Sequence, residues 1–111
     1  MPMDHRLYLD DIIEAVARIR QYTAGMDEGT FGADTKTQDA VVRNLEVIGE
    51  AAARLPDEIR QAAPNIEWHK IRALRNLLIH DYFGIHLPIV WNIVQTKLDT
   101  LDDACRNLLL K

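Results

Sequence analysis

The eight residues from Arg75 to Tyr82 carry the side chains of this sequence that are best suited to phosphate chemistry. An arginine, a histidine and a tyrosine surround three consecutive large apolar residues. The planar guanidinium of arginine suits phosphate oxygens, and histidine can exchange a proton near neutral pH. The tyrosine hydroxyl can be modified, and its ring can stack on a base. Together these side chains could cleave a phosphodiester bond without a metal.

RNA supplies its own nucleophile, the 2′-hydroxyl, so a ribonuclease needs proton transfer and stabilisation of the transition state. We predict that His80 acts as general base or acid, a role that typically contributes about 10²–10⁴-fold. We predict that Arg75 binds the non-bridging phosphate oxygens. Asn76 precedes His80 by four residues, one helical turn, and could orient the imidazole.

The sequence predicts neither a metal nor a cofactor. The conceivable ligands His69, His80 and His86 are spaced by 11 and 6 residues, and no carboxylate pair supports them. The single cysteine, Cys105, excludes an intrachain disulfide and a zinc site built on a cysteine pair.

The spacing of Arg75 and His80 is unfavourable for a site on one straight helix. Five residues correspond to about 140° around an ideal helix. The two side chains share a site only if the helix ends or distorts near Ile79, if the arginine reaches around, or if two chains meet there. A symmetric dimer would also supply two histidines, one for each proton transfer.

The positions of apolar residues predict an all-α, up-and-down bundle of four long helices and one short helix. The long helices are expected over residues 4–22, 35 or 37–55, 66–79 and 87–110, and the short one over 57–63. Residues 24–32 contain three glycines and are expected to form a loop. Asp34 or Thr37 could cap the second helix, and Asn65 the third.

Apolar residues recur every three or four positions along each long helix, which predicts the buried stripes. The predicted core positions are Leu9, Ile12, Val16 and Ile19; Val41, Leu45, Ile48, Ala52 and Leu55; Ile71, Leu74 and Leu78, with Leu77 beside them; and Trp91, Val94, Leu98, Leu101, Cys105 and Leu108. Gly49 lies inside the second helix, where it costs roughly 1 kcal/mol relative to alanine. A close contact with another helix would explain it.

Bulk properties are typical of a small cytosolic protein. The 111 residues suit a single domain over 1–111. The first residues show no apolar signal segment, and no apolar run approaches the roughly 20 residues that cross a bilayer. We therefore expect a cytoplasmic protein that does not contact a membrane.

The charge is unevenly distributed along the chain. The formal net charge is −4, which argues against a general nucleic-acid binder. Residues 68–98 nevertheless hold four basic residues and one acid, a balance of +3, and the rest of the chain has −7. Lys70 and Arg72 lie in this basic part and are the predicted RNA-binding residues.

Three segments resemble one family. Arg75, His80 and Tyr82 reproduce the R-x-x-x-x-H-x-Y signature of the HEPN superfamily, specifically of its HepT-like toxins. Residues 46–51 resemble that family's E-x-I-G-E-A stretch, and residues 64–68 resemble the proline–tryptophan lead into its motif. The resemblance spans essentially the whole chain.

The resemblance implies a homodimeric HEPN-like bundle with the sites facing a cleft at the dimer interface. It implies a metal-independent endoribonuclease toxin in which Arg75 and His80 are catalytic and Asn76 supports them. It further implies a cognate minimal nucleotidyltransferase antitoxin that neutralises the toxin by transferring AMP to Tyr82.

Two other functions stay open at this point. The chain could be a non-catalytic HEPN partner or a nucleotide- or substrate-binding subunit of a nucleotidyltransferase, in which Arg75 and His80 bind without cleaving. It could also be a purely structural dimeric bundle, although that leaves the local basic balance unexplained. Mere binding does not require a titrating histidine, so the intact motif favours the enzyme.

Overall fold

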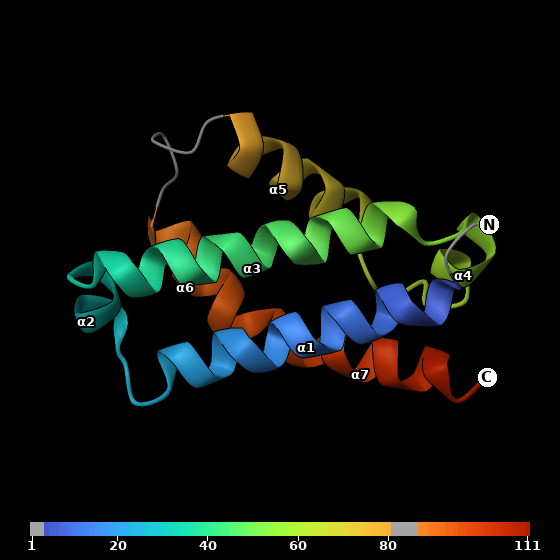
Figure 1. The fold of residues 1–111 in the computed structure, drawn as a ribbon, viewed down its shortest axis with the longest axis horizontal. Helices are drawn as coiled ribbons and strands as arrows, with labels where there is room; N and C mark the ends of the chain where they lie inside the picture. The colour runs from blue at the N-terminus through green and yellow to red at the C-terminus, as the bar shows by residue number, and fades with distance from the viewer. Residues whose placement is uncertain (1–3, 81–86) are drawn as a thin grey trace.

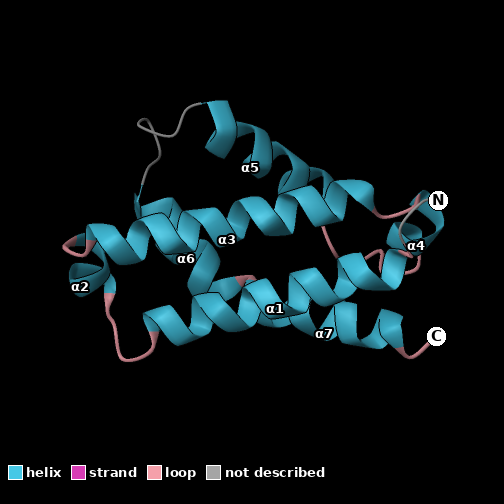
Figure 2. Ribbon diagram, viewed as in Figure 1, coloured by secondary structure: helices cyan, strands magenta, loops and turns pink. Residues whose placement is uncertain are grey.

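The chain folds into helices joined by short connections, as seen in a computed structural model that describes residues 4–80 and 87–111 (Figure 1). Within those two stretches there is no β-strand (Figure 2). The helices are α1 (His5–Thr23), α2 (Glu28–Gly32), α3 (Thr35–Arg54), α4 (Asp57–Gln61), α5 (Trp68–His80), α6 (Leu87–Thr96) and α7 (Leu98–Leu109). The predicted all-α, HEPN-like bundle is confirmed.

Neighbouring long helices run in opposite directions (Figure 1). Helix α3 packs antiparallel to α1 on one side and to α5 on the other, and α7 packs along α1. The predicted stripes of α1 and α3 are all buried, and Leu9, Ile12, Val16 and Ile19 have no exposed surface. The core therefore lies mainly between α1, α3 and α7, with α5 packed on the outer side of α3.

The segment predicted as a loop contains the short helix α2. Asp27 and Thr30 form a capping box, in which the Thr30 amide donates to Asp27 Oδ1 at 2.8 Å and the Asp27 amide donates to Thr30 Oγ1 at 2.9 Å. Phe31 is buried and its ring centroid lies 5.1 Å from that of Trp91. The cap and this aromatic contact outweigh the helix-breaking tendency of the glycines.

The last predicted helix is divided at Lys97 into α6 and α7. Thr96 Oγ1 donates a hydrogen bond to the carbonyl of Asn92, four residues earlier, at 2.7 Å. Such back-bonding by threonine bends helices. The bend allows α6 to contact α2 while α7 follows α1.

Helix α5 begins two residues later than predicted, and Asn65 does not cap it. The carbonyl of Glu67 accepts the first amide hydrogen bonds, from Lys70 at 2.9 Å and Ile71 at 3.3 Å. Asp34, by contrast, caps α3 as predicted, because its Oδ1 accepts from the Thr37 amide at 3.0 Å.

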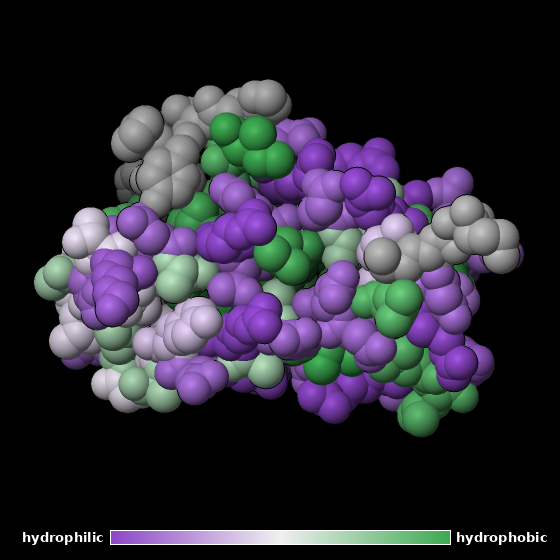
Figure 3. All heavy atoms as spheres, viewed as in Figure 1, coloured by the Kyte–Doolittle hydropathy of each residue, from purple (hydrophilic) through white to green (hydrophobic). Residues whose placement is uncertain are grey.

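The C-terminal part of α5 leaves apolar side chains uncovered. Leu78 is buried, but Leu77 and Ile79 are 46% and 48% exposed, so Leu77 does not belong to the inner stripe. Figure 3 shows an apolar patch over this end of α5, beside the residues drawn in grey. None of the described helices is long and apolar enough to span a bilayer.

Candidate active site

Arg75 lies at a close contact between α5 and α3. A Cβ atom built on Gly49 of α3 would lie 2.4 Å from Arg75 Cβ and 3.4 Å from its Cα. Real Cβ atoms essentially never come that close, so only glycine fits at this position. The predicted explanation for Gly49, a close contact between helices, is confirmed, and the partner is the predicted catalytic arginine.

Glu50, the residue after Gly49, fixes the direction of the Arg75 guanidinium. Arg75 Nε donates to Glu50 Oε2 at 2.8 Å, and Arg75 Nη2 lies 2.6 Å from the same oxygen. The other carboxylate oxygen, Oε1, accepts from Nε and Nη2 of Arg54 at 3.1 and 2.9 Å. One carboxylate thus joins two arginines, one on its own helix and one on α5.

Hydrogen bonding to these arginines favours the ionised form of Glu50. Arg54, followed by Arg75, lowers the pKa of the Glu50 carboxyl below its ordinary value of 4.5. The Glu50 and Arg75 side chains are 43% and 29% exposed, so solvent screens the pair and its net contribution to stability is small. The main consequence of the pair is the orientation of Arg75.

Asn76 is exposed, and its Oδ1 accepts from Arg75 Nη1 at a long 3.4 Å. It therefore lies beside the arginine, and its predicted role in orienting His80 stays a prediction. His80 is the last residue of α5, and its side chain lies outside the described part of the chain, as does the whole of Tyr82. Helix α5 is continuous to His80, so no break precedes that residue.

The two predicted RNA-binding residues have different surroundings. Lys70 Nζ forms an ion pair with Glu67 Oε2 at 2.8 Å. Arg72 is exposed and forms no ion pair with any residue that the structure describes. The structure therefore does not join Lys70 and Arg72 into one continuous basic surface.

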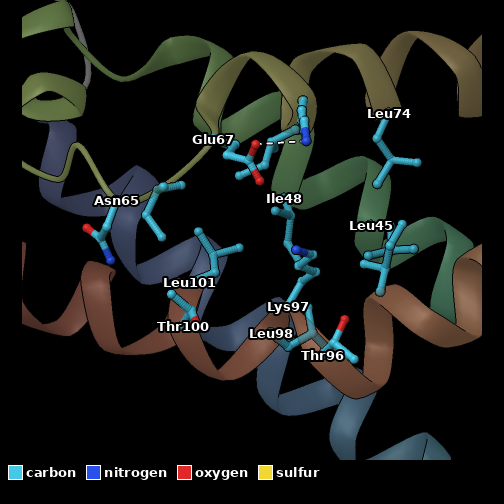
Figure 4. A pocket seen from close by; sticks show the side chains of 14 residues that line it. Leu45, Ile48, Asn65, Glu67, Leu74, Thr96, Lys97, Leu98, Thr100 and Leu101 are labelled. Carbon is cyan, nitrogen blue, oxygen red and sulfur yellow. Dashed lines mark ion pairs between the residues drawn. The ribbon is translucent and has the colours of Figure 1, made fainter.

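An apolar cavity of about 300 Å³ lies between α3, α5 and the α6–α7 bend (Figure 4). Leu45, Ile48, Leu74 and Leu101 contribute to its walls, and the Glu67–Lys70 pair lies at its edge. Its lining includes neither Arg75 nor Glu50. The cavity is therefore not lined by the arginine of the sequence motif.

Residues 4–80 and 87–111 contain neither a cluster of metal ligands nor a reactive thiol. No group of three His, Cys, Asp or Glu within those ranges is placed to hold a metal ion. Burial raises the pKa of the Cys105 thiol to about 12, which keeps it protonated and poorly nucleophilic.

The helical bundle and the Arg75 site together define a small all-α protein of the kind that the sequence motif suggests. The sequence profile of the family described as "Ribonuclease HepT-like" matches residues 12–108. The chain belongs to this family.

Several relatives cover almost the whole chain. It is 38% identical over 101 residues to "Probable ribonuclease HepT" of Thermococcus cleftensis, which covers 91% of this chain and 92% of the relative. It is 44% identical over 95 residues to "Putative RNase MJ0127" of Methanocaldococcus jannaschii, covering 86% and 78%. It is 32% identical over 106 residues to "Putative RNase TTE0752" of Caldanaerobacter subterraneus, covering 96% and 95%. No solved structure is significantly similar to the chain.

The residue that sequence reasoning did not assign to the site is Glu50. In the sequence, Glu50 belongs only to the stretch over residues 46–51 that resembles the family. Its partner Arg75 is 25 positions away, so no local spacing reveals the pair. The signal in the sequence is Gly49. A glycine in mid-helix marks a place where another helix comes close, and the next residue, Glu50, can then contact that helix.

Gly49→Ala should destabilise the protein, although alanine is the better helix former. Helix propensity alone favours alanine by roughly 1 kcal/mol. The clash with Arg75 Cβ forces α3 and α5 apart, and overpacking of this kind costs about 1–3 kcal/mol. Urea unfolding followed by circular dichroism measures the change. Gly32→Ala is the matched control, because a Cβ there meets nothing within 4 Å; equal stability losses for the two variants would contradict the contact.

Glu50→Gln should remove a pH-dependent part of the stability. A lowered carboxyl pKa in the folded state stabilises that state above the ordinary pKa of 4.5, and this contribution disappears as pH falls through the lowered pKa. The difference in unfolding free energy between wild type and Glu50→Gln should therefore shrink as the pH is lowered from 6 toward about 3. Glu58→Gln serves as control, since Glu58 is exposed and has no ion pair among the described residues. A difference that does not vary with pH would rule out the proposed pairing.

Proposed function

We propose that this protein is an endoribonuclease that cleaves RNA without a metal, with Arg75 and His80 as its catalytic residues. The observation that carries the proposal is the fixed guanidinium of Arg75. This arginine lies on α5, the helix that ends at His80, and it is held by its contact with Gly49 and by Glu50, both on α3. Membership of the HepT-like family, and relatives named as ribonucleases, support it.

The proposed reaction is an internal transesterification. The 2′-oxygen attacks the adjacent phosphorus, the bond to the 5′-oxygen breaks, and the products are a 2′,3′-cyclic phosphate and a 5′-hydroxyl. One histidine accepts the proton of the 2′-hydroxyl, and a protonated histidine donates a proton to the leaving 5′-oxygen. Arg75 stabilises the charge that develops on the non-bridging oxygens.

Glu50 leaves part of the guanidinium available for this task. It engages Nε and Nη2 of Arg75, while Nη1 makes, among the described residues, only the long contact with Asn76. A phosphate oxygen can therefore bind at Nη1 while Glu50 holds the opposite edge. In this proposal Glu50 is a positioning residue and Asn76 supports the arginine.

We propose that the active form is a homodimer with a cleft between its two copies of α5. Three large apolar side chains near the ends of α5 and α6 are about half exposed, namely Leu77, Ile79 and Ile89. Covering them with a second chain would remove apolar surface from water. The dimer would also bring together two copies of His80 and relieve the 140° separation within one chain.

The proposed biological role is that of a toxin controlled by a minimal nucleotidyltransferase antitoxin. Transfer of AMP to Tyr82 would add a phosphate and an adenine two residues from His80. The phosphate would compete for Arg75 and the adenine would occupy the cleft, so RNA could no longer bind. This role rests on the R-x-x-x-x-H-x-Y motif and on family membership.

One observation favours the alternative of a non-catalytic nucleotide-binding partner. Arg75 is already paired with a carboxylate, and many paired arginines have only a structural role. In that case the chain would bind nucleotides or a nucleotidyltransferase substrate and leave RNA intact. An activity measurement separates the two functions.

The purified protein should cleave RNA in the presence of EDTA, and His80→Ala should lower the rate by about 10²–10⁴-fold, the usual contribution of a general acid or base. Cleavage of a fluorescently labelled RNA, with identification of a cyclic phosphate end, measures this. The Lys36→Ala variant, a change at the opposite end of α3, controls for the handling of variants. Full activity of His80→Ala, or cleavage only with added divalent metal, would contradict the proposal.

Mixing the inactive variants tests the composite site within the same assay. Arg75→Ala and His80→Ala chains each retain the residue that the other lacks. Cleavage should return in part on mixing if one site takes its arginine and histidine from different chains, because the mixed dimer then holds one complete Arg75–His80 pair but only one of the two histidines. No recovery in mixed dimers that demonstrably form would mean that both residues of a site come from the same chain or that cleavage requires both histidines.

Tyr82→Phe should retain ribonuclease activity and escape modification. Incubation of the wild-type chain with a cognate nucleotidyltransferase and ATP should add one AMP, seen in the intact mass, and abolish cleavage. The variant lacks the acceptor hydroxyl, so neither effect should occur. An adduct of the same mass on Tyr82→Phe would assign the modification to another residue.

A further inference from the structure

A hollow between α4 and the first turn of α5 combines an aromatic ring with an arginine that has no ion pair among the described residues. Trp68, His69 and Arg72 form its α5 side, and Arg60 and Gln61 of α4 lie opposite, around a volume of about 480 Å³. This hollow is separate from the Gly49–Arg75 contact and from the apolar cavity beside Lys70. The proposed catalytic steps do not use it.

The charges around the hollow favour an anion. Arg60 pairs with Asp57, so that positive charge is neutralised within α4. Arg72 has no ion pair with any described residue, whereas its neighbours on α5, Lys70 and Arg75, are both paired. Among the described residues, the Arg72 guanidinium therefore has no carboxylate partner and is available to a ligand.

The indole ring of Trp68, which lines the hollow, is fixed by two hydrogen bonds. Trp68 Nε1 donates to the carbonyls of Arg60 at 3.0 Å and Ala63 at 3.2 Å, which anchors the indole to α4. The ring is half-buried and lines the hollow. A fixed aromatic surface beside a guanidinium suits a nucleotide, whose base stacks and whose phosphate pairs with arginine.

The position along α5 connects this hollow to the proposed cleavage site. Arg72 precedes Arg75 by three residues, so the two lie on neighbouring positions of one helix side, with Cβ atoms about 5–6 Å apart. Trp68 lies seven residues before Arg75, about 10 Å along the helix axis. A strand with its scissile phosphate on Arg75 can therefore reach the hollow with the next nucleotide.

We propose that the hollow formed by Trp68, His69 and Arg72 is a subsite for a nucleotide that flanks the scissile phosphate of single-stranded RNA. The base of this nucleotide lies against Trp68. Arg72 binds the phosphate next to the scissile one, and Arg75 binds the scissile phosphate itself. The subsite rests on the proposed ribonuclease function, and its role is to bind longer RNA more tightly than a dinucleotide.

Binding of an RNA that cannot be cleaved tests the subsite independently of catalysis. The probe is an eight-nucleotide 2′-O-methyl oligoadenylate, which lacks the attacking hydroxyl. In a Trp91→Phe chain the remaining tryptophan is Trp68, so its fluorescence reports on the hollow. The oligonucleotide should quench this fluorescence, and Arg72→Ala should weaken binding by roughly tenfold.

Salt dependence identifies the phosphate contact. Loss of one contact to a single strand should reduce the slope of log affinity against log salt by about 0.7. Arg72→Lys should keep that slope, and the remote Lys36→Ala should keep both slope and affinity. In cleavage assays, Arg72→Ala should raise KM for an octanucleotide and leave a dinucleotide unaffected.

The outcomes separate the subsite from the proposed function. Unchanged Trp68 fluorescence on binding, or equal affinity of Arg72→Ala, would overturn the subsite even if RNA is cleaved. Binding that depends on Arg72 in a chain that never cleaves RNA would support the subsite and reject the ribonuclease. Loss of nucleotidyltransferase binding in Arg72→Ala, with oligonucleotide binding intact, would instead make this surface a protein interface and overturn the proposal.

Discussion

The close approach of α5 to α3 at Gly49 is the constraint on which the candidate site depends. Helix α5 packs chiefly on α3, so this contact determines the distance between the two helices. Any side chain at position 49 would overlap Arg75 Cβ. Glycine is therefore required at position 49, despite its lower helix propensity. Its lack of a side chain lets the Arg75 Cβ lie directly on α3, where the guanidinium reaches Glu50.

Glu50 turns this steric arrangement into an electrostatic one. Its two oxygens engage different arginines, Arg54 along α3 and Arg75 across the helix interface. Because the group is partly exposed, the ion pairs add little stability but restrict the arginine to one direction. The pairing also reduces the positive potential at Arg75. In the proposed ribonuclease, a phosphate would then bind at the guanidinium edge that the carboxylate leaves open, which favours directional contacts over attraction by net charge.

The sequence predicted the features that depend on local periodicity. The stripes of α1 and α3 are buried because their apolar residues recur at helical spacing, and Gly49 marked a close contact. The apolar stripe continues unbroken through Lys97, so periodicity gave no sign of the bend between α6 and α7, which involves a side-chain hydrogen bond of Thr96. Helix α2 was not predicted, because the glycines in this segment favour a loop. The Glu50–Arg75 pair joins segments that are distant in the sequence, so it became visible only once the packing of α3 against α5 was known.

The same helix that fixes Arg75 leaves its own end uncovered. Leu78 is buried while the residues on either side of it, Leu77 and Ile79, are about half exposed. The C-terminal end of α5, where one buried leucine lies between exposed apolar side chains, gains stability when another surface covers it. The arginine is thus held by contacts within the chain, whereas the segment leading to His80 has apolar surface left for a partner. This asymmetry gives a physical reason why a site on α5 would be completed by a second chain. Arg75 is already fixed within its own chain, and the apolar surface that would drive assembly lies at the end of α5 that leads to His80.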